Sequence, residues 1–245
     1  MESYSLTSGV LVTPKGIISA GSIAIRASRI ASFSKQEKKS FALGASSIVY
    51  PALLNVHDHL RGNYLPRVGP KANSFYLNWL PWDNDLKASS TYSERSNLTV
   101  DELYSLSAYK NLFSGVTTVN DHFPHELNDS LLPKLPIRAF REYCLAHECS
   151  SFDLNWGDGI GIEHQRALDN NWPFITHLEE GFDAESMDGV GVLERLGRLE
   201  EHCLLIHCIG LSEADIAKIA KAKASNFLSA SSTSFKCSML LRIDS

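Results

Sequence analysis

Cysteine is scarce in this chain, and long hydrophobic runs are absent from it. Its 245 residues include five cysteines, Cys144, Cys149, Cys203, Cys208 and Cys237. An odd and sparse set excludes a disulfide framework and predicts a reducing, cytoplasmic location. Two pairs share a C-x4-C spacing that also occurs in zinc sites. A five-residue step puts strand side chains on opposite faces, so we favour buried free thiols.

Neither sign of charge is in large excess, and no segment is apolar enough for a membrane. The formal net charge is −5, with 44% hydrophobic and 21% charged residues. This composition predicts a globular protein with a real core and no nucleic-acid or membrane partner. No run of 18 apolar residues is present, and the first residues lack the pattern of a signal peptide. The length is close to that of a single (β/α)8 barrel.

The most informative stretch is 46–60, with the sequence SSIVYPALLNVHDHL. Its β-prone apolar residues predict a buried strand, which leads directly into His57 and His59. In an extended chain, side chains two positions apart point to the same side, so both imidazoles face one point while Asp58 faces away. Neutral imidazole is a common zinc ligand, and the pair predicts half of a metal site.

Further strands are expected to end at histidines. Residues 172–177 and 203–207 both form apolar β-prone runs that end on a histidine, His177 and His207. Runs at 116–119 and 137–140 add strands without a histidine, whereas residues 143–170 are poorly patterned. The strands alternate with helical patterns, which predicts parallel pairing. Because the carboxyl ends of parallel strands form one face, the histidines are expected to converge there.

The rest of the chain suggests three parts. Residues 1–49 are expected to form a small β-layer, 50–224 a partial barrel and 225–245 a divergent tail. Residues 61–98 are predicted to be a long loop rich in aromatics, in which Trp79 and Trp82 are candidate substrate-binding residues. The sequence TVDE at 99–102 has the pattern of a capping box. It predicts a helix that carries four apolar side chains along one stripe, Leu103, Leu106, Tyr109 and Phe113.

Several motifs together resemble the amidohydrolase superfamily, in particular its branch of cytosine and adenosine-type deaminases and triazine hydrolases. PALLNVHDH at 51–59 is similar to the first barrel strand of that family, and GVTTV at 115–119 to the second. THLEEG at 176–181 resembles the fifth-strand motif, and LIHCIGL at 205–211 the sixth. The resemblance implies an α/β fold, an incomplete (β/α)8 TIM-type barrel of about six strands with an N-terminal β-sandwich-like layer.

The resemblance also implies roles for individual residues. His57, His59 and His177 would be metal ligands, Glu180 the general acid/base, and His207 a substrate or proton-transfer partner. One divalent ion is expected, with zinc as the first candidate and iron as the second. A metal-bound water with a pKa near ~7 would supply hydroxide, and Glu180 could move its proton. Many relatives use a bridging lysine, but lysine is absent between Lys134 and Lys218, which favours a single metal.

The predicted function is hydrolysis of a C–N bond in a small molecule, by deamination of a purine-, pyrimidine- or pterin-like amine. From residue 225 the family pattern is lost, and the eighth-strand aspartate has no counterpart except Asp244 near the end. We therefore expect a truncated member, which completes its barrel through a homo-oligomer or lacks activity. The alternatives are an inactive remnant or binding module, and a cyclic amide hydrolase.

Overall fold

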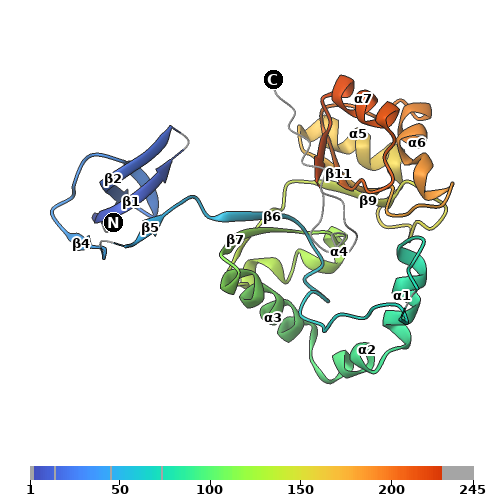
Figure 1. Cartoon of the computed structure of the whole chain (residues 1–245), viewed down its shortest axis with the longest axis horizontal. Coiled ribbons are helices and arrows are strands. Elements are labelled where there is room, and N and C mark those ends of the chain that lie inside the picture. The colour runs from blue at the N-terminus through green and yellow to red at the C-terminus, as the bar shows by residue number, and fades with distance from the viewer. Residues whose placement is uncertain (1–2, 14, 45, 73, 228–245) are drawn as a thin grey trace. The chain divides into compact units, whose positions relative to one another are not determined.

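The structure is a computed structural model that describes residues 3–13, 15–44, 46–72 and 74–227. The chain divides into two compact units, Met1–Leu53 and Leu54–Ser245. Each unit has its own sheet or sheets, and Figure 1 labels most of their strands with the names used below. Asp244 and Cys237 lie outside the described residues.

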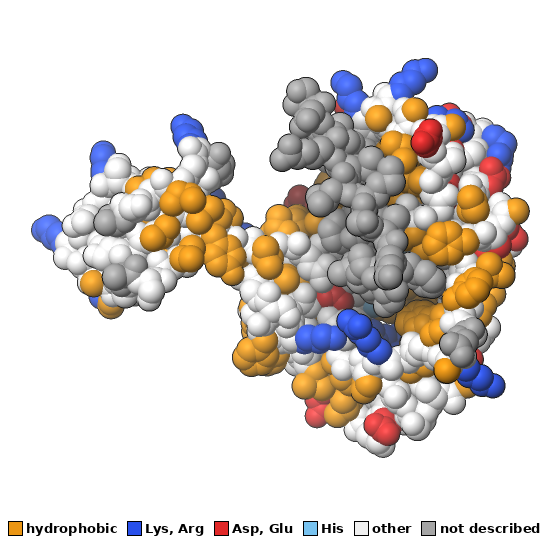
Figure 2. Space-filling view, in the orientation of Figure 1, with side chains coloured by type: hydrophobic (Ala, Val, Ile, Leu, Met, Phe, Trp, Pro, Cys, Tyr) orange, Lys and Arg blue, Asp and Glu red, His pale blue; other side chains and the backbone are white. Residues whose placement is uncertain are grey.

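The N-terminal unit is one five-stranded sheet. Its strands are β1 (Ser3–Thr13), β2 (Gly16–Arg26), β3 (Arg29–Ser32), β4 (Ser40–Ala42) and β5 (Ile48–Val49). β1 and β2 are antiparallel, and β4 and β5 both pair with β1 in parallel. Leu11, Ile23 and Ala24 are buried, whereas Ile17 is 71% exposed. Hydrophobic side chains are visible on the surface of this unit (Figure 2), and the second layer of the expected sandwich stays a prediction.

The larger unit contains two sheets that hold the predicted barrel strands. The three-stranded sheet has the order β6 (Leu53–Asp58), β7 (Val116–Asp121), β8 (Arg138–Ala139). The four-stranded sheet contains β9 (Cys144–Glu148), β10 (Phe174–Leu178), β11 (Cys203–His207) and β12 (Ser225–Phe227). β9, β10, β11 and β12 pair in parallel with their neighbours, as do β7 and β8. The expected α/β architecture is confirmed.

Helices follow most of these strands and cover the four-stranded sheet on one side. The α-helices are α1 (Trp79–Ala88), α2 (Ser90–Glu94), α3 (Val100–Phe113), α4 (His125–Asn128), α5 (Ile160–Asn170), α6 (Gly189–Arg195) and α7 (Glu213–Ala222). Short 3-10 turns lie at Arg95–Asn97, Leu132–Lys134 and Ser186–Asp188. Phe174, Leu178, Val190 and Leu193 are fully buried in the core between sheet and helices. None of the helices in the described part of the chain is long and apolar enough to span a membrane.

Three details differ from the sequence predictions. The segment 61–98 is not a single loop, because it contains α1 and α2. Residues 144–148, which lack a clear pattern, form the fully buried strand β9. The sheet also continues beyond residue 224, where β12 pairs with β11. The four described cysteines are all buried and free, as predicted.

Helix α3 begins where the sequence predicts, but the face that it packs against the core is not the predicted one. Thr99 and Glu102 form both halves of the capping box. Of the predicted apolar stripe, only Leu103 is buried, and Phe113 is 89% exposed. The prediction of one packed stripe is wrong, because the helix buries a different face, formed by Leu103, Tyr104, Ser107, Ala108 and Asn111.

Candidate metal centre

Six of the nine histidines gather at the carboxyl ends of the strands. They come from β6, from the end of β7, and from β9, β10 and β11: His57, His59, His122, His147, His177 and His207. The ring centroids of His57 and His177 are 5.0 Å apart, and those of His57 and His207 are also 5.0 Å apart. The convergence of imidazoles from separate strands, predicted from the sequence, is confirmed.

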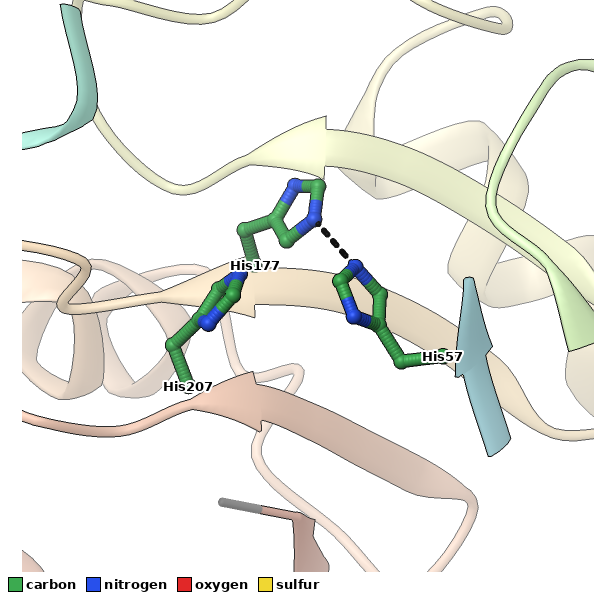
Figure 3. Close-up of side chains that lie close together, drawn as sticks. All are labelled: His57, His177 and His207. Atoms are coloured by element: carbon green, nitrogen blue, oxygen red, sulfur yellow. Dashed lines mark hydrogen bonds between the residues drawn. The ribbon is translucent and has the colours of Figure 1, made fainter. Parts of the chain in front are cut away.

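Three of these rings point toward one another (Figure 3). His57, His177 and His207 each offer a ring nitrogen, and these nitrogens lie within 4.8 Å of one another. The two Nε2 atoms of His57 and His177 are 2.9 Å apart. His177 Nδ1 donates a hydrogen bond of 2.7 Å to the backbone carbonyl of His147. This contact fixes the tautomer of His177 and leaves the Nε2 lone pair directed at His57.

Burial keeps these imidazoles neutral. Desolvation, together with the neighbouring His59, lowers the pKa of His207 and of His147 to about 3. The same two causes lower the pKa of His57 and His177 well below the ordinary value. Neutral imidazole is the form that binds a metal ion, so the cluster is held in its ligand state at neutral pH.

His59 lies beside this group of three. Its ring centroid is 4.9 Å from that of His57 and 5.5 Å from that of His177, on which it stacks. Burial lowers the pKa of His59 to about 4. Among the described residues, the group of nitrogens within 4.8 Å contains His207 in place of His59. The ligand role of His59 therefore stays a prediction, and His207 becomes a further ligand candidate.

Asp58, the last residue of β6, lies between His57 and His59 in the sequence and faces away from them as expected. Its carboxylate accepts hydrogen bonds from three asparagine side chains: Asn55 at 2.9 Å, Asn63 at 2.8 Å and Asn111 at 2.6 Å. Asn111 lies on α3, so the network ties the end of β6 to a helix. Charge-assisted bonds of this kind are short and strong, and they hold the strand end that carries His57 and His59.

Glu180 lies next to the histidine cluster. Its Oε2 is 3.3 Å from Nε2 of His207, and its side chain is 24% exposed. Burial raises the pKa of Glu180 well above its usual range, and the carboxylate of Glu148 raises it further. A carboxyl group with a raised pKa beside an imidazole can exchange a proton near neutral pH. The predicted acid/base role of Glu180 is consistent with this placement and stays a prediction.

The two tryptophans proposed for substrate binding lie on α1 in different surroundings. Trp79 is 8% exposed, and its Nε1 donates a hydrogen bond of 2.6 Å to Oε2 of Glu148. Its ring centroid lies 5.1 Å from that of His147. Trp82 is 39% exposed, and its Nε1 bonds to the carbonyl of Val68 at 3.2 Å. Trp79 is therefore in contact with the histidine cluster, whereas Trp82 bonds to Val68, within the 61–98 segment.

Sequence reasoning missed His122, His147 and Glu148. His122 directly follows β7, and its ring stacks on His177 with centroids 4.1 Å apart. His147 lies in β9, and its Nδ1 accepts a hydrogen bond of 3.2 Å from the backbone of Leu154. The rule that located His177, a histidine at a strand's carboxyl end, would also have found His122 if β7 had been extended past Val119.

The donor set fits a soft-to-borderline divalent cation. The cluster offers neutral nitrogen donors, and His122 is fully buried although neither of its ring nitrogens makes a well-formed hydrogen bond within the described residues. The Nε2 atoms of His57 and His177 are 2.9 Å apart, and the Nε2 of His177 carries a lone pair. A cation could bind between these two atoms. Imidazole suits zinc and iron, whereas magnesium and calcium prefer oxygen.

No family model matches the chain, and no curated protein gives a significant match. Solved structures do match. One is a triazine hydrolase from Arthrobacter aurescens, with 16% identity and a TM-score of 0.66, covering 92% of this chain and 65% of that one. A guanine deaminase from C. acetobutylicum with bound guanine has 16% identity and a TM-score of 0.63, covering 92% and 67%.

An adenosine deaminase from Xanthomonas campestris with bound zinc is also similar, with 15% identity and a TM-score of 0.61, covering 91% of this chain and 61% of that one. The chain thus spans about 65% of the length of the first structures that it matches. At these identities the likeness concerns the fold. The resemblance predicted from the motifs is confirmed at that level: the chain has the fold of the amidohydrolase superfamily, to which these three neighbours belong.

Proposed function

We propose that the protein is a metal-dependent hydrolase of carbon–nitrogen bonds that removes an amino group from a small heterocyclic amine. The observation that carries this proposal is the meeting of His57, His177 and His207 within 4.8 Å, with Glu180 3.3 Å from His207. The fold shared with the guanine and adenosine deaminases supports the same reaction class.

The metal would be held by His57 and His177, together with His59 or His207. Zinc is the first candidate, since the adenosine deaminase neighbour contains it and the donors here are imidazoles. When bound, a zinc ion supplies hydroxide at neutral pH by lowering the pKa of a water to about 7. The remaining steps fall to residues of the chain.

Glu180 would take a proton at its carboxylate and return it to the leaving nitrogen. A leaving amine must be protonated, and a carboxyl group whose pKa is raised can deliver that proton near neutral pH. His207, beside Glu180, would orient that carboxyl group and donate to the developing negative charge on the substrate. If His207 is instead a metal ligand, the orienting role is lost and Glu180 acts alone.

Flat rings suit a flat substrate. The rings of Phe123 and Trp156 lie 4.9 Å apart at 31°, and Trp156 also approaches His147 at 4.6 Å. These side chains border His59, whose centroid is 5.4 Å from that of Phe123. Aromatic faces of this kind stack on planar heterocycles, which supports a purine-, pyrimidine- or pterin-like amine as the substrate class.

The test combines metal content with product analysis. The full chain, purified and loaded with zinc, is mixed with amino-purines, amino-pyrimidines and amino-pterins, and released ammonia is measured with and without a chelator. Chelator-sensitive ammonia release that is lost in Glu180→Gln is expected. Release of a ring-opened product without ammonia would indicate cyclic amide hydrolysis. A zinc-loaded, folded chain that converts none of the substrates would refute the proposal and favour a binding module.

A further inference from the structure

Glu148 is a buried carboxylate that the proposed reaction does not use. It ends strand β9, pairs in register with His177 of β10, and is 2% exposed. The preceding residue, His147, supplies the carbonyl that holds His177 Nδ1. The charge of Glu148 also acts on Glu180. The carboxylate therefore lies at the edge of the histidine cluster, beside the proposed acid/base.

Among the residues that the structure describes, only one of the two Glu148 oxygens has a well-formed hydrogen-bond partner. Oε2 accepts the 2.6 Å hydrogen bond from Trp79 Nε1. Oε1 is buried, and no described residue gives it a well-formed hydrogen bond. Burial raises the pKa of Glu148, and the nearby side chain of Ser150 opposes this shift. Ser150 does not, however, form a well-formed hydrogen bond to Oε1. A buried carboxylate oxygen that lacks a donor is costly, so a donor from a ligand would be strongly favoured.

The segment that carries Trp79 is fixed in place. Asn78 forms an isolated bridge with Gly181, and its Nδ2 donates to Asp183 at 2.7 Å. The backbone of Phe182 donates to the carbonyl of Leu77 at 2.8 Å. Trp79 is thereby held against the strand ends, and its indole N–H sets the orientation of the Glu148 carboxylate. Trp79 is therefore a positioning residue: its indole N–H is bonded to Glu148 and is not available to a substrate.

We propose that Glu148 is a specificity-determining residue, whose Oε1 accepts a hydrogen bond from a ring N–H of the substrate. The inference rests on the proposed function and narrows it: the preferred heterocycle carries a ring N–H in addition to the amino group that is removed. One free oxygen provides for one such N–H. An analogue that lacks this hydrogen leaves the buried oxygen unpaired, which is the situation in which hydrogen-bonding sites discriminate most strongly.

The experiment compares matched ligands that differ in one hydrogen. The probes are 9-methylguanine against 1,9-dimethylguanine, and cytosine against 1-methylcytosine. Binding to the zinc-loaded full chain is measured by equilibrium dialysis, and ammonia release is measured in parallel. The variants are Glu148→Gln and, as a control of equal charge change, Glu201→Gln, an exposed residue just before β11. Circular dichroism verifies that each variant is folded.

The protein should bind at least one N–H probe about 10- to 100-fold more tightly than its N-methyl partner, the range expected for a hydrogen bond to a charged group. Glu148→Gln should reduce this ratio to about threefold or less, whereas Glu201→Gln should leave it unchanged. A steric preference would survive in Glu148→Gln. The inference is overturned by equal binding within both pairs, by a ratio that Glu148→Gln leaves unchanged, or by no binding of either N–H probe.

The two proposals fail in different ways. A Glu148-dependent N–H preference without ammonia release would refute the hydrolase and retain the recognition role. Ammonia release without that preference would do the reverse. If Glu148→Gln does not fold, Trp79→Phe takes its place, because it removes the N–H that donates to Oε2 and keeps an aromatic side chain. It should lower the N–H preference about three- to tenfold, and an unchanged preference would overturn the inference.

Discussion

Acid should unfold the metal-free protein through its buried histidines. Five imidazoles of the cluster are at most 8% exposed: His57, His122, His147, His177 and His207. Burial lowers the pKa of each of them, to about 3 in His147 and His207. In the unfolded chain their pKa returns to about 6.5. Below that pH the unfolded state binds more protons, so the free energy of unfolding falls as the pH falls.

The size of the effect follows from this difference. Between pH 7.5 and pH 5.5, each such imidazole lowers the free energy of unfolding by about 1.3 kcal/mol. Five of them give at most about 7 kcal/mol if they titrate independently, and coupling between the imidazoles reduces the total. A loss of this size is comparable to the whole stability of many domains. The free energy of unfolding is therefore highest above the unfolded-state pKa of about 6.5, and it falls progressively as the pH is lowered toward 3.

The assay is urea unfolding after chelation, followed by tryptophan fluorescence at the two pH values. The unfolding midpoint should fall strongly at pH 5.5. His147→Gln should reduce the pH dependence by about one imidazole, roughly 1.3 kcal/mol, whereas His202→Gln, outside the cluster, should not reduce it by that amount. If the midpoint is the same at both pH values, the histidines are not buried as a neutral cluster and the reasoning is refuted.

Three substitutions test the surrounding structure by denaturant unfolding. Gly181→Ala would place a Cβ 2.6 Å from that of Asn78 and should lower the free energy of unfolding by about 1–3 kcal/mol. In the control Gly161→Ala, the new Cβ meets no atom within 4 Å and should not destabilise the protein. Equal effects of the two substitutions would contradict the packing of residues 78–79 against Gly181. Asp58→Ala leaves three asparagine donors without their acceptor and should cost on the order of 3 kcal/mol, and a loss below about 1 kcal/mol would count against the network. Phe174→Ala, in the fully buried core, should cost about 3–5 kcal/mol, and a small loss would place this strand elsewhere.

The sequence predicted the part of the site that depends on strand periodicity. The spacing of His57 and His59 and the strand ends at His177 and His207 were sufficient to predict their convergence. The predicted Asp58 direction is likewise a consequence of alternation along a strand. These features are local, and parallel topology then brings the strand ends together.

Features that depend on packing were not predictable in this way. Strand β9 contains Cys144, Leu145 and Ala146 but no β-branched residue, so its composition does not indicate a strand. The packing face of α3 is hard to predict from the sequence because Tyr104 shares it with Ala108 and Asn111, small or polar residues that also turn toward the strands. Asn111 does so to reach Asp58, a partner 53 positions away that no periodicity indicates.

The pairing of Trp79 with Glu148 is another long-range contact, between residues 69 positions apart. From the sequence, the aromatic residues of 61–98 were expected to contact a substrate. In the structure, Trp79 instead donates a hydrogen bond to the Glu148 carboxylate. Short-range patterns therefore located the histidines, and the tertiary structure revealed the carboxylate beside them.

The most direct test of the central claim is the zinc content of the purified chain after extensive dialysis. The histidine cluster predicts about one zinc per chain, lost in His57→Ala and in His177→Ala and retained in His202→Gln. A folded protein that retains no zinc, or that retains it equally in all three variants, would contradict the claim that these imidazoles form a metal centre.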